Sequence, residues 1–155
     1  MSKRLLVALL FSAGCIDTDA AVFVDATIGA AGLTVVPQGG LGFGMQGSFA
    51  LELHLGARAS GTSQVTYTSF SLKASDGTVV VESLPVAVDK PSPVAVEPGS
   101  DVLVTFTVDT GAATLDPAIK DKICAGQVQI VGVIEDSLES ESSPLESPPF
   151  AAAGC

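Results

Sequence analysis

The sequence predicts an all-β protein, a sandwich of about seven to nine short strands. Apolar residues alternate with polar ones over 49–57, so that Phe49, Leu51 and Leu53 would share one face of a strand but would scatter around a helix. The same alternation recurs over 102–108. Turn-forming residues interrupt the chain at intervals of about ten residues, which is typical of sandwiches.

The strands are separated by glycine, proline and aspartate. The stretch 29–32 is rich in glycine and alanine and is expected to divide the first apolar run into two strands. Asp76-Gly77 lies between two β-rich runs and predicts a tight hairpin there. In chain order, the expected strands are 22–28, 33–36, 49–57, 65–72, 79–82, 94–96, 102–108 and 127–134.

Two segments depart from this pattern. A short helical turn is expected within 115–125, with Asp116 as its cap and Pro117 at its first helical position. The stretch 137–149 is rich in serine, glutamate and proline and is expected to be a long acidic loop. An apolar end that closes with Cys155 follows it, and we expect this end to form a last edge segment.

In the spacing of its strands alone, the region 22–155 resembles immunoglobulin-like domains. The resemblance implies a β-sandwich that packs its sheet faces together and presents loops at its two ends. The chain departs from the pattern of antibody domains, because it has no tryptophan and its two late cysteines do not bracket the core strands.

The composition argues against several classes of function. The chain has 155 residues, a formal net charge of −10, one histidine, one tyrosine and no tryptophan. Such an acidic chain is a poor partner for nucleic acids, whose phosphates require lysine and arginine. With so few of the usual catalytic and ligand side chains, we expect no catalytic residues, no metal site and no cofactor.

The first residues follow the order of an export signal. Lys3 and Arg4 precede an apolar run over 5–13, which is too short to cross a bilayer as a helix. Gly14 and Cys15 follow. The stretch Ser12-Ala13-Gly14-Cys15 resembles the lipobox of bacterial lipoproteins, although that family prefers leucine at the position of Ser12.

The lipoprotein resemblance implies a signal peptide over 1–14, cleavage between Gly14 and Cys15, and a lipid anchor on Cys15. Residues 15–21 would then be the lipidated cysteine and a tether, and 22–155 the domain. The implied location is the bacterial cell envelope, at the outer membrane rather than the inner, because Ile16 stands where inner-membrane lipoproteins of enteric bacteria carry aspartate. Two alternatives stay open, a secretory signal cut elsewhere and an uncleaved apolar segment.

The remaining cysteines, Cys124 and Cys155, form an even pair once Cys15 carries lipid. Exported proteins favour such pairs, so we predict a Cys124–Cys155 disulfide. The alternative is two free thiols.

The glycine-rich stretch 39–47 is the candidate binding loop. It carries Leu41, Phe43 and Met45, apolar residues that a purely solvated loop has little reason to hold. The alternative is that these side chains fold down and cap the core. The segment contains a literal G-x-G-x-x-G, but a dinucleotide site needs a strand directly before it and a helix directly after it, and neither is expected here.

His54 is expected to face solvent beside Glu52, and the acidic run 135–146 to be a solvated face. These features favour a non-enzymatic binding or structural module, attached to the membrane through Cys15, with an envelope protein as its candidate partner. Two alternatives stay open. One is an enzyme, or an enzyme subunit, with an acid-based site, and the other is an accessory lipoprotein of a larger envelope assembly.

Overall fold

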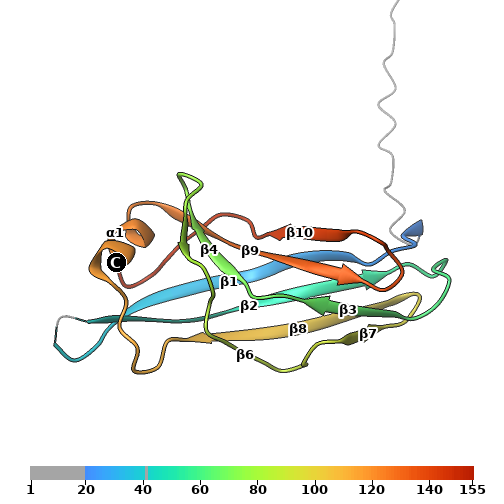
Figure 1. Cartoon of the computed structure of the whole chain (residues 1–155), viewed down its shortest axis with the longest axis horizontal. Coiled ribbons are helices and arrows are strands. Elements are labelled where there is room, and N and C mark those ends of the chain that lie inside the picture. Colours follow the sequence, from blue (N-terminus) through green and yellow to red (C-terminus); the bar gives the residue numbers. More distant parts are fainter. Residues whose placement is uncertain (1–19, 41) are drawn as a thin grey trace, which may run out of the picture.

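The protein is an all-β sandwich of two antiparallel sheets, as the sequence predicts. The computed structural model describes residues 20–40 and 42–155, and Figure 1 shows the two layers of strands. The four-stranded sheet has the order β1 (Asp25–Pro37), β2 (Phe43–Leu55), β8 (Ser100–Asp109), β6 (Val86–Val88). The other sheet is β5 (Val79–Val81), β4 (Ser71–Ala74), β9 (Gln127–Asp136), β3 (Ser63–Tyr67), β7 (Val94–Val96), with β10 (Ser142–Glu146) and β11 (Phe150–Ala151) also on β9.

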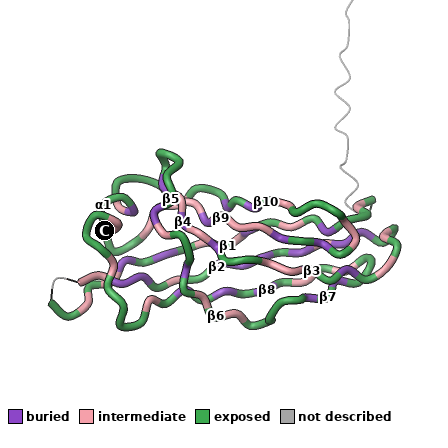
Figure 2. Tube along the Cα trace, viewed as in Figure 1, coloured by how far each residue is buried: buried purple, intermediate pink, exposed green. Residues whose placement is uncertain are grey.

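The alternation over 49–57 and 102–108 places one apolar face of β2 and β8 in the core. Phe49 lies opposite Phe106 in the register, and Leu51 lies opposite Val104. All four are at most 1% exposed. Figure 2 shows the resulting change between buried and exposed residues along these strands. Both predicted strands are therefore confirmed, together with the face that each one buries.

An aromatic cluster joins the two sheets. The Phe49 and Phe106 rings stack at a centroid distance of 4.7 Å. Phe70, which precedes β4 in the other sheet, meets both rings edge-on at 4.9 Å. Edge-on and offset aromatic contacts add stability beyond the area they bury, so this cluster fixes how one sheet sits on the other.

The first apolar run forms one strand and not the two that were expected. β1 continues through the stretch 29–32 by a register shift between Gly29 and Gly32. Ala30 takes a positive φ of 48° at this bulge. On the facing strand, a side chain at Gly47 would stand 2.1 Å from the Gly32 carbonyl oxygen. The glycines therefore permit a close approach of the two backbones at a bulge, where the sequence pattern indicated a break.

The prediction of an acidic loop over 137–149 is wrong for the central residues of this stretch. Residues 142–146 form β10, an edge strand paired with β9. Leu145 is only 7% exposed, whereas the residues on either side of it are exposed. An edge strand can be polar along one side and needs few apolar residues to pack, which is why its composition resembles that of a loop. The described residues form eleven strands, because β10, β6 and β11 add to the expected strands and the expected run 65–72 divides into β3 and β4, while 22–28 and 33–36 merge into β1.

The helix and the turn at Asp76 are confirmed. Helix α1 (Pro117–Cys124) is capped by the Asp116 carboxylate, which accepts from the Ala118 amide at 2.8 Å. In the β4–β5 turn, the Asp76 carboxylate accepts from the Thr78 amide at 2.9 Å, and Gly77 has the positive φ of 86° that the turn requires.

The last residues, 150–155, form what we call the C-terminal strap. Phe150 pairs with Val128 of β9. Farther along, Ala153 bridges to β1, donating its amide to Leu33 at 2.8 Å and accepting from Val35 at 2.8 Å. The strap thus connects an edge of one sheet with the other sheet.

A disulfide fixes the end of this strap. Cys155 bonds to Cys124 at the end of α1, with their Cα atoms 5.5 Å apart. The predicted Cys124–Cys155 disulfide is confirmed. The closed loop spans a sequence separation of 31 and contains β9, β10 and β11.

Candidate functional site

The candidate binding loop is smaller than the sequence suggested. Met45 lies in β2, opposite Val35, and is fully buried. Phe43 is the first residue of β2 and is half-buried, with the Lys120 ammonium 4.3 Å from its ring centroid. These two side chains therefore pack against the domain, as expected from the alternative in which they fold down and cap the core. Leu41 lies outside the described residues.

The most distinctive polar cluster lies instead on the outer face of the four-stranded sheet. Asp25, His54 and Asp101 form one row across β1, β2 and β8. Glu52 lies in the next row, between Thr27 and Leu103. These residues line a groove of about 290 Å³ together with Leu53 and Val102. We call it the outer-face groove.

His54 pairs with Asp101 and not with Glu52. The distance from the His54 Nδ1 atom to the Asp101 Oδ1 atom is 2.6 Å. The Glu52 carboxylate leans the other way, over β1, where its Oε1 atom stands 2.9 Å from the point that a side chain on Gly29 would occupy. Residues two apart on a strand are about 6.6 Å from each other, whereas direct neighbours on adjacent strands are about 5 Å apart. The cross-strand partner therefore takes the contact.

The outer-face groove presents hydrogen-bond acceptors around an apolar edge. It holds three carboxylates and one imidazole, and Leu103 beside them is 51% exposed. Such a surface favours a ligand that combines a positive charge with an apolar body. Among the described residues, no set of three or more His, Cys, Asp or Glu side chains has the arrangement needed to hold a metal ion.

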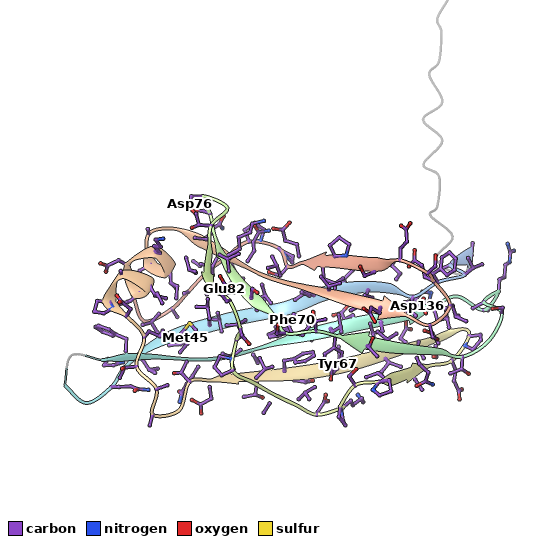
Figure 3. The ribbon with its side chains drawn as sticks, in the orientation of Figure 1. Met45, Tyr67, Phe70, Asp76, Glu82 and Asp136 are labelled. Carbon is purple, nitrogen blue, oxygen red and sulfur yellow. A yellow bond between two sulfur atoms is a disulfide. The ribbon has the colours of Figure 1, made fainter. Side chains whose placement is uncertain are left out.

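Sequence reasoning missed a buried carboxylate. Asp136 was expected on a solvated face but is 5% exposed. It accepts from the Val24 amide at 2.7 Å, from the Leu138 amide at 2.8 Å and from the Ser63 hydroxyl. Figure 3 shows Asp136 at the end of β9. Its position could have been found from the alternation, because Asp136 shares its face of β9 with Ile130 and Ile134.

A wider polar cleft of about 690 Å³ lies beside this carboxylate, between β3 and the β9–β10 turn. Its lining includes Glu135, Glu139 and Glu141, whose charge gives this end of the sandwich an acidic surface. Asp136 contributes to the wall, but its hydrogen bonds serve the fold, because they fasten the chain where it enters β1.

Two pKa shifts have clear physical causes. Burial raises the pKa of Tyr67, whose hydroxyl donates to the Lys90 carbonyl at 2.7 Å. This phenol contacts the Phe106 ring edge-on at 5.2 Å and stays neutral well above neutral pH. At the β4–β5 turn, hydrogen bonds from Thr78 lower the pKa of Asp76. Neither residue lines the outer-face groove.

The sandwich has two distinct ends, which Figure 1 shows. Residues 20–24, the β2–β3 connection 56–62 and the β9–β10 turn 137–141 form one end, which we call the root end. The β1–β2 turn, α1 and Cys155 lie at the opposite end, which we call the far end. The strand β1 has 13 residues, so the ends are about 40 Å apart at roughly 3.3 Å per residue.

No protein-family model matches the chain, and neither the curated proteins nor the solved structures give a match. Within residues 20–40 and 42–155, no helix combines the length and apolar character needed to cross a membrane. The predicted processing site, Gly14 and Cys15, lies outside the described residues.

Proposed function

We propose that this chain is a lipid-anchored, non-enzymatic binding or structural module of the bacterial cell envelope. One observation carries the proposal. The Cys124–Cys155 disulfide accounts for two of the three cysteines and leaves Cys15, the cysteine within Ser12-Ala13-Gly14-Cys15, as the attachment point for lipid. We place the anchor at the outer membrane, because Ile16 and not aspartate follows Cys15.

Two further features support this function. Disulfides persist in oxidising compartments such as the bacterial periplasm, which agrees with an exported protein. The root end, where the described chain begins, faces away from α1 and the strap. An anchor on Cys15 would therefore leave the far end exposed toward an envelope protein partner. The outer-face groove suits a basic segment of such a partner, because opposite charges favour encounter.

The first prediction concerns the anchor. A Cys15→Ser variant expressed in bacteria should incorporate no labelled fatty acid and should accumulate as an unprocessed precursor, because the thiol that takes the lipid is gone. Metabolic labelling with palmitate followed by electrophoresis measures both. A Cys124→Ser variant is the matched control and should label as the parent does. Normal labelling and maturation of Cys15→Ser would contradict the proposal.

A second candidate, an enzyme with an acid-based site, is favoured by the His54–Asp101 pair, since such a pair can act as a general base. A His54→Gln variant separates the two functions. If the protein is a binding module, the His54→Gln variant should keep its lipid anchor. Its free energy of unfolding should fall by less than about 1 kcal/mol, because the ion pair that it loses is solvent-screened: the Asp101 side chain is 84% exposed. An enzyme should turn over a model ester or glycoside, and this turnover should disappear in His54→Gln. Chemical denaturation and a chromogenic substrate screen provide the two readouts.

A further inference from the structure

Two consecutive apolar side chains are exposed at the root end. Val22 is 47% exposed and Phe23 is 44% exposed. Only two other large hydrophobic residues in the described part of the chain are comparably exposed, Val79 and Leu103. Those two stand singly, on β5 and on the outer sheet face, whereas Val22 and Phe23 form a pair. We call this pair the root pair.

The fold holds the root pair in place. The backbone bends at both residues before β1 begins. The next residue, Val24, is 8% exposed and donates its amide to the Asp136 carboxylate at 2.7 Å. Asp136 is in turn fastened by Leu138 and Ser63. The two exposed side chains therefore directly precede a buried hydrogen-bonded anchor, and their position is set by the sandwich.

The chain length places this pair close to the predicted lipid. Six residues, 16–21, separate Cys15 from Val22. Even a fully extended chain of this length spans at most about 25 Å. A lipid anchor on Cys15 thus keeps the root pair within reach of the bilayer surface.

We infer that the root pair rests in the bilayer interface and that the root end is a lipid-contact surface. This inference deepens the proposed function and rests on it. Exposed apolar side chains leave water when they enter the boundary between headgroups and acyl chains, and phenylalanine is among the residues that interfacial segments bury there. The acyl chains supply the attachment, while Val22 and Phe23 determine which end of the domain touches the membrane.

The charge of the root end selects the kind of lipid. Glu135, Glu139 and Glu141 line the cleft beside Asp136, close to where the root pair enters the fold. These carboxylates repel an anionic surface, since charges interact over about a Debye length. The contact therefore fits a zwitterionic surface, and it weakens as anionic lipid is added.

The absence of tryptophan from the sequence allows a direct test. A Phe23→Trp variant carries a single indole in the root pair. Val79→Trp is the matched control, at an equally exposed position on β5. Val79 lies opposite Lys73 of β4, and Lys73 lies opposite Gln129 near the start of β9, whereas Asp136 is the last residue of β9. Each protein, purified in its lipidated mature form, is reconstituted into phosphatidylcholine vesicles with and without doxyl-labelled lipid. A Cys15→Ser, Phe23→Trp double variant supplies the spectrum of the unanchored domain.

The expected result is a blue shift and the loss of most of the fluorescence for the Phe23→Trp indole in doxyl vesicles, with neither effect for Val79→Trp. Replacing part of the phosphatidylcholine with phosphatidylglycerol should reduce the quenching at position 23. If the lipidated protein sediments with vesicles but the two indoles show the same emission shift and the same quenching, the lipid-contact surface is overturned, while the proposed lipid-anchored module is not. If Cys15 takes no lipid and the protein does not sediment, the proposed lipid-anchored module and the lipid-contact surface are both overturned.

Discussion

Replacing Phe106 with alanine should lower the free energy of unfolding by about 3–5 kcal/mol, because it removes a fully buried ring and leaves a cavity. Phe106 is 0% exposed and contacts Phe49, Phe70 and Tyr67 at centroid distances between 4.7 and 5.2 Å. Its partners come from both sheets, so the cavity cannot close without moving one sheet over the other. Urea denaturation followed by circular dichroism measures the loss.

The neighbouring residue Thr105 provides the control for this prediction. Thr105 alternates with Phe106 on β8, and its side chain is on the exposed outer face. A Thr105→Ala substitution should cost no more than about 1 kcal/mol, the range over which exposed side chains differ in their preference for a strand. Similar losses for Thr105→Ala and Phe106→Ala would show that the register of β8 is wrong.

A Cys155→Ser substitution should lower the free energy of unfolding by about 3–4 kcal/mol in the chain-entropy account. In this account the disulfide restricts the conformations of the unfolded chain, because it closes a loop with a sequence separation of 31. The loss should also be visible locally. Ala153 pairs with Leu33 and Val35 of β1, so freeing the end of the strap should accelerate hydrogen exchange at the Val35 amide more than at central core amides.

Two comparisons test whether the disulfide is the cause. Cys124→Ser should lose as much stability as Cys155→Ser, and the double variant should lose no more than either, because each single change already breaks the bond. Reducing the parent protein with dithiothreitol should lower its stability to the same level. Additive losses in the double variant would mean that the two side chains act separately.

The sequence was informative wherever one strong periodic signal governed a segment. Alternation over 49–57 and 102–108 identified β2, β8 and their buried faces, because a half-buried strand admits only one assignment of faces. Asp116 and Pro117 identified the start of α1, and Asp76-Gly77 the hairpin, since each depends on local backbone chemistry. The disulfide could also be predicted, because only two cysteines remained to pair once Cys15 was set aside.

The sequence failed where the deciding contact came from a distant strand. Asp136 looked like part of an acidic surface run, and although the alternation along β9 points its side chain inward, the amide that satisfies the buried carboxylate belongs to Val24, 112 residues away along the chain. Met45 looked like a loop residue, and pairing with Val35 brings it into the core. His54 was expected to lie beside Glu52 on its own strand, but the register of β2 with β8 places Asp101 opposite His54, and the two side chains form a hydrogen-bonded pair.

By itself, the sequence determined the all-β class, the inward faces of the strongest strands and the helix cap, because these follow from side-chain periodicity and from interactions between near neighbours in the chain. It also determined the cysteine pair, because only Cys124 and Cys155 remain once Cys15 is set aside. The tertiary structure decided the strand register, the conversion of 142–146 into an edge strand, the strap across both sheets and the outer-face groove. Each of these depends on which strand lies beside which. Strand neighbours are set by long-range packing of both sheets, and a local pattern of polar and apolar residues is compatible with several such arrangements.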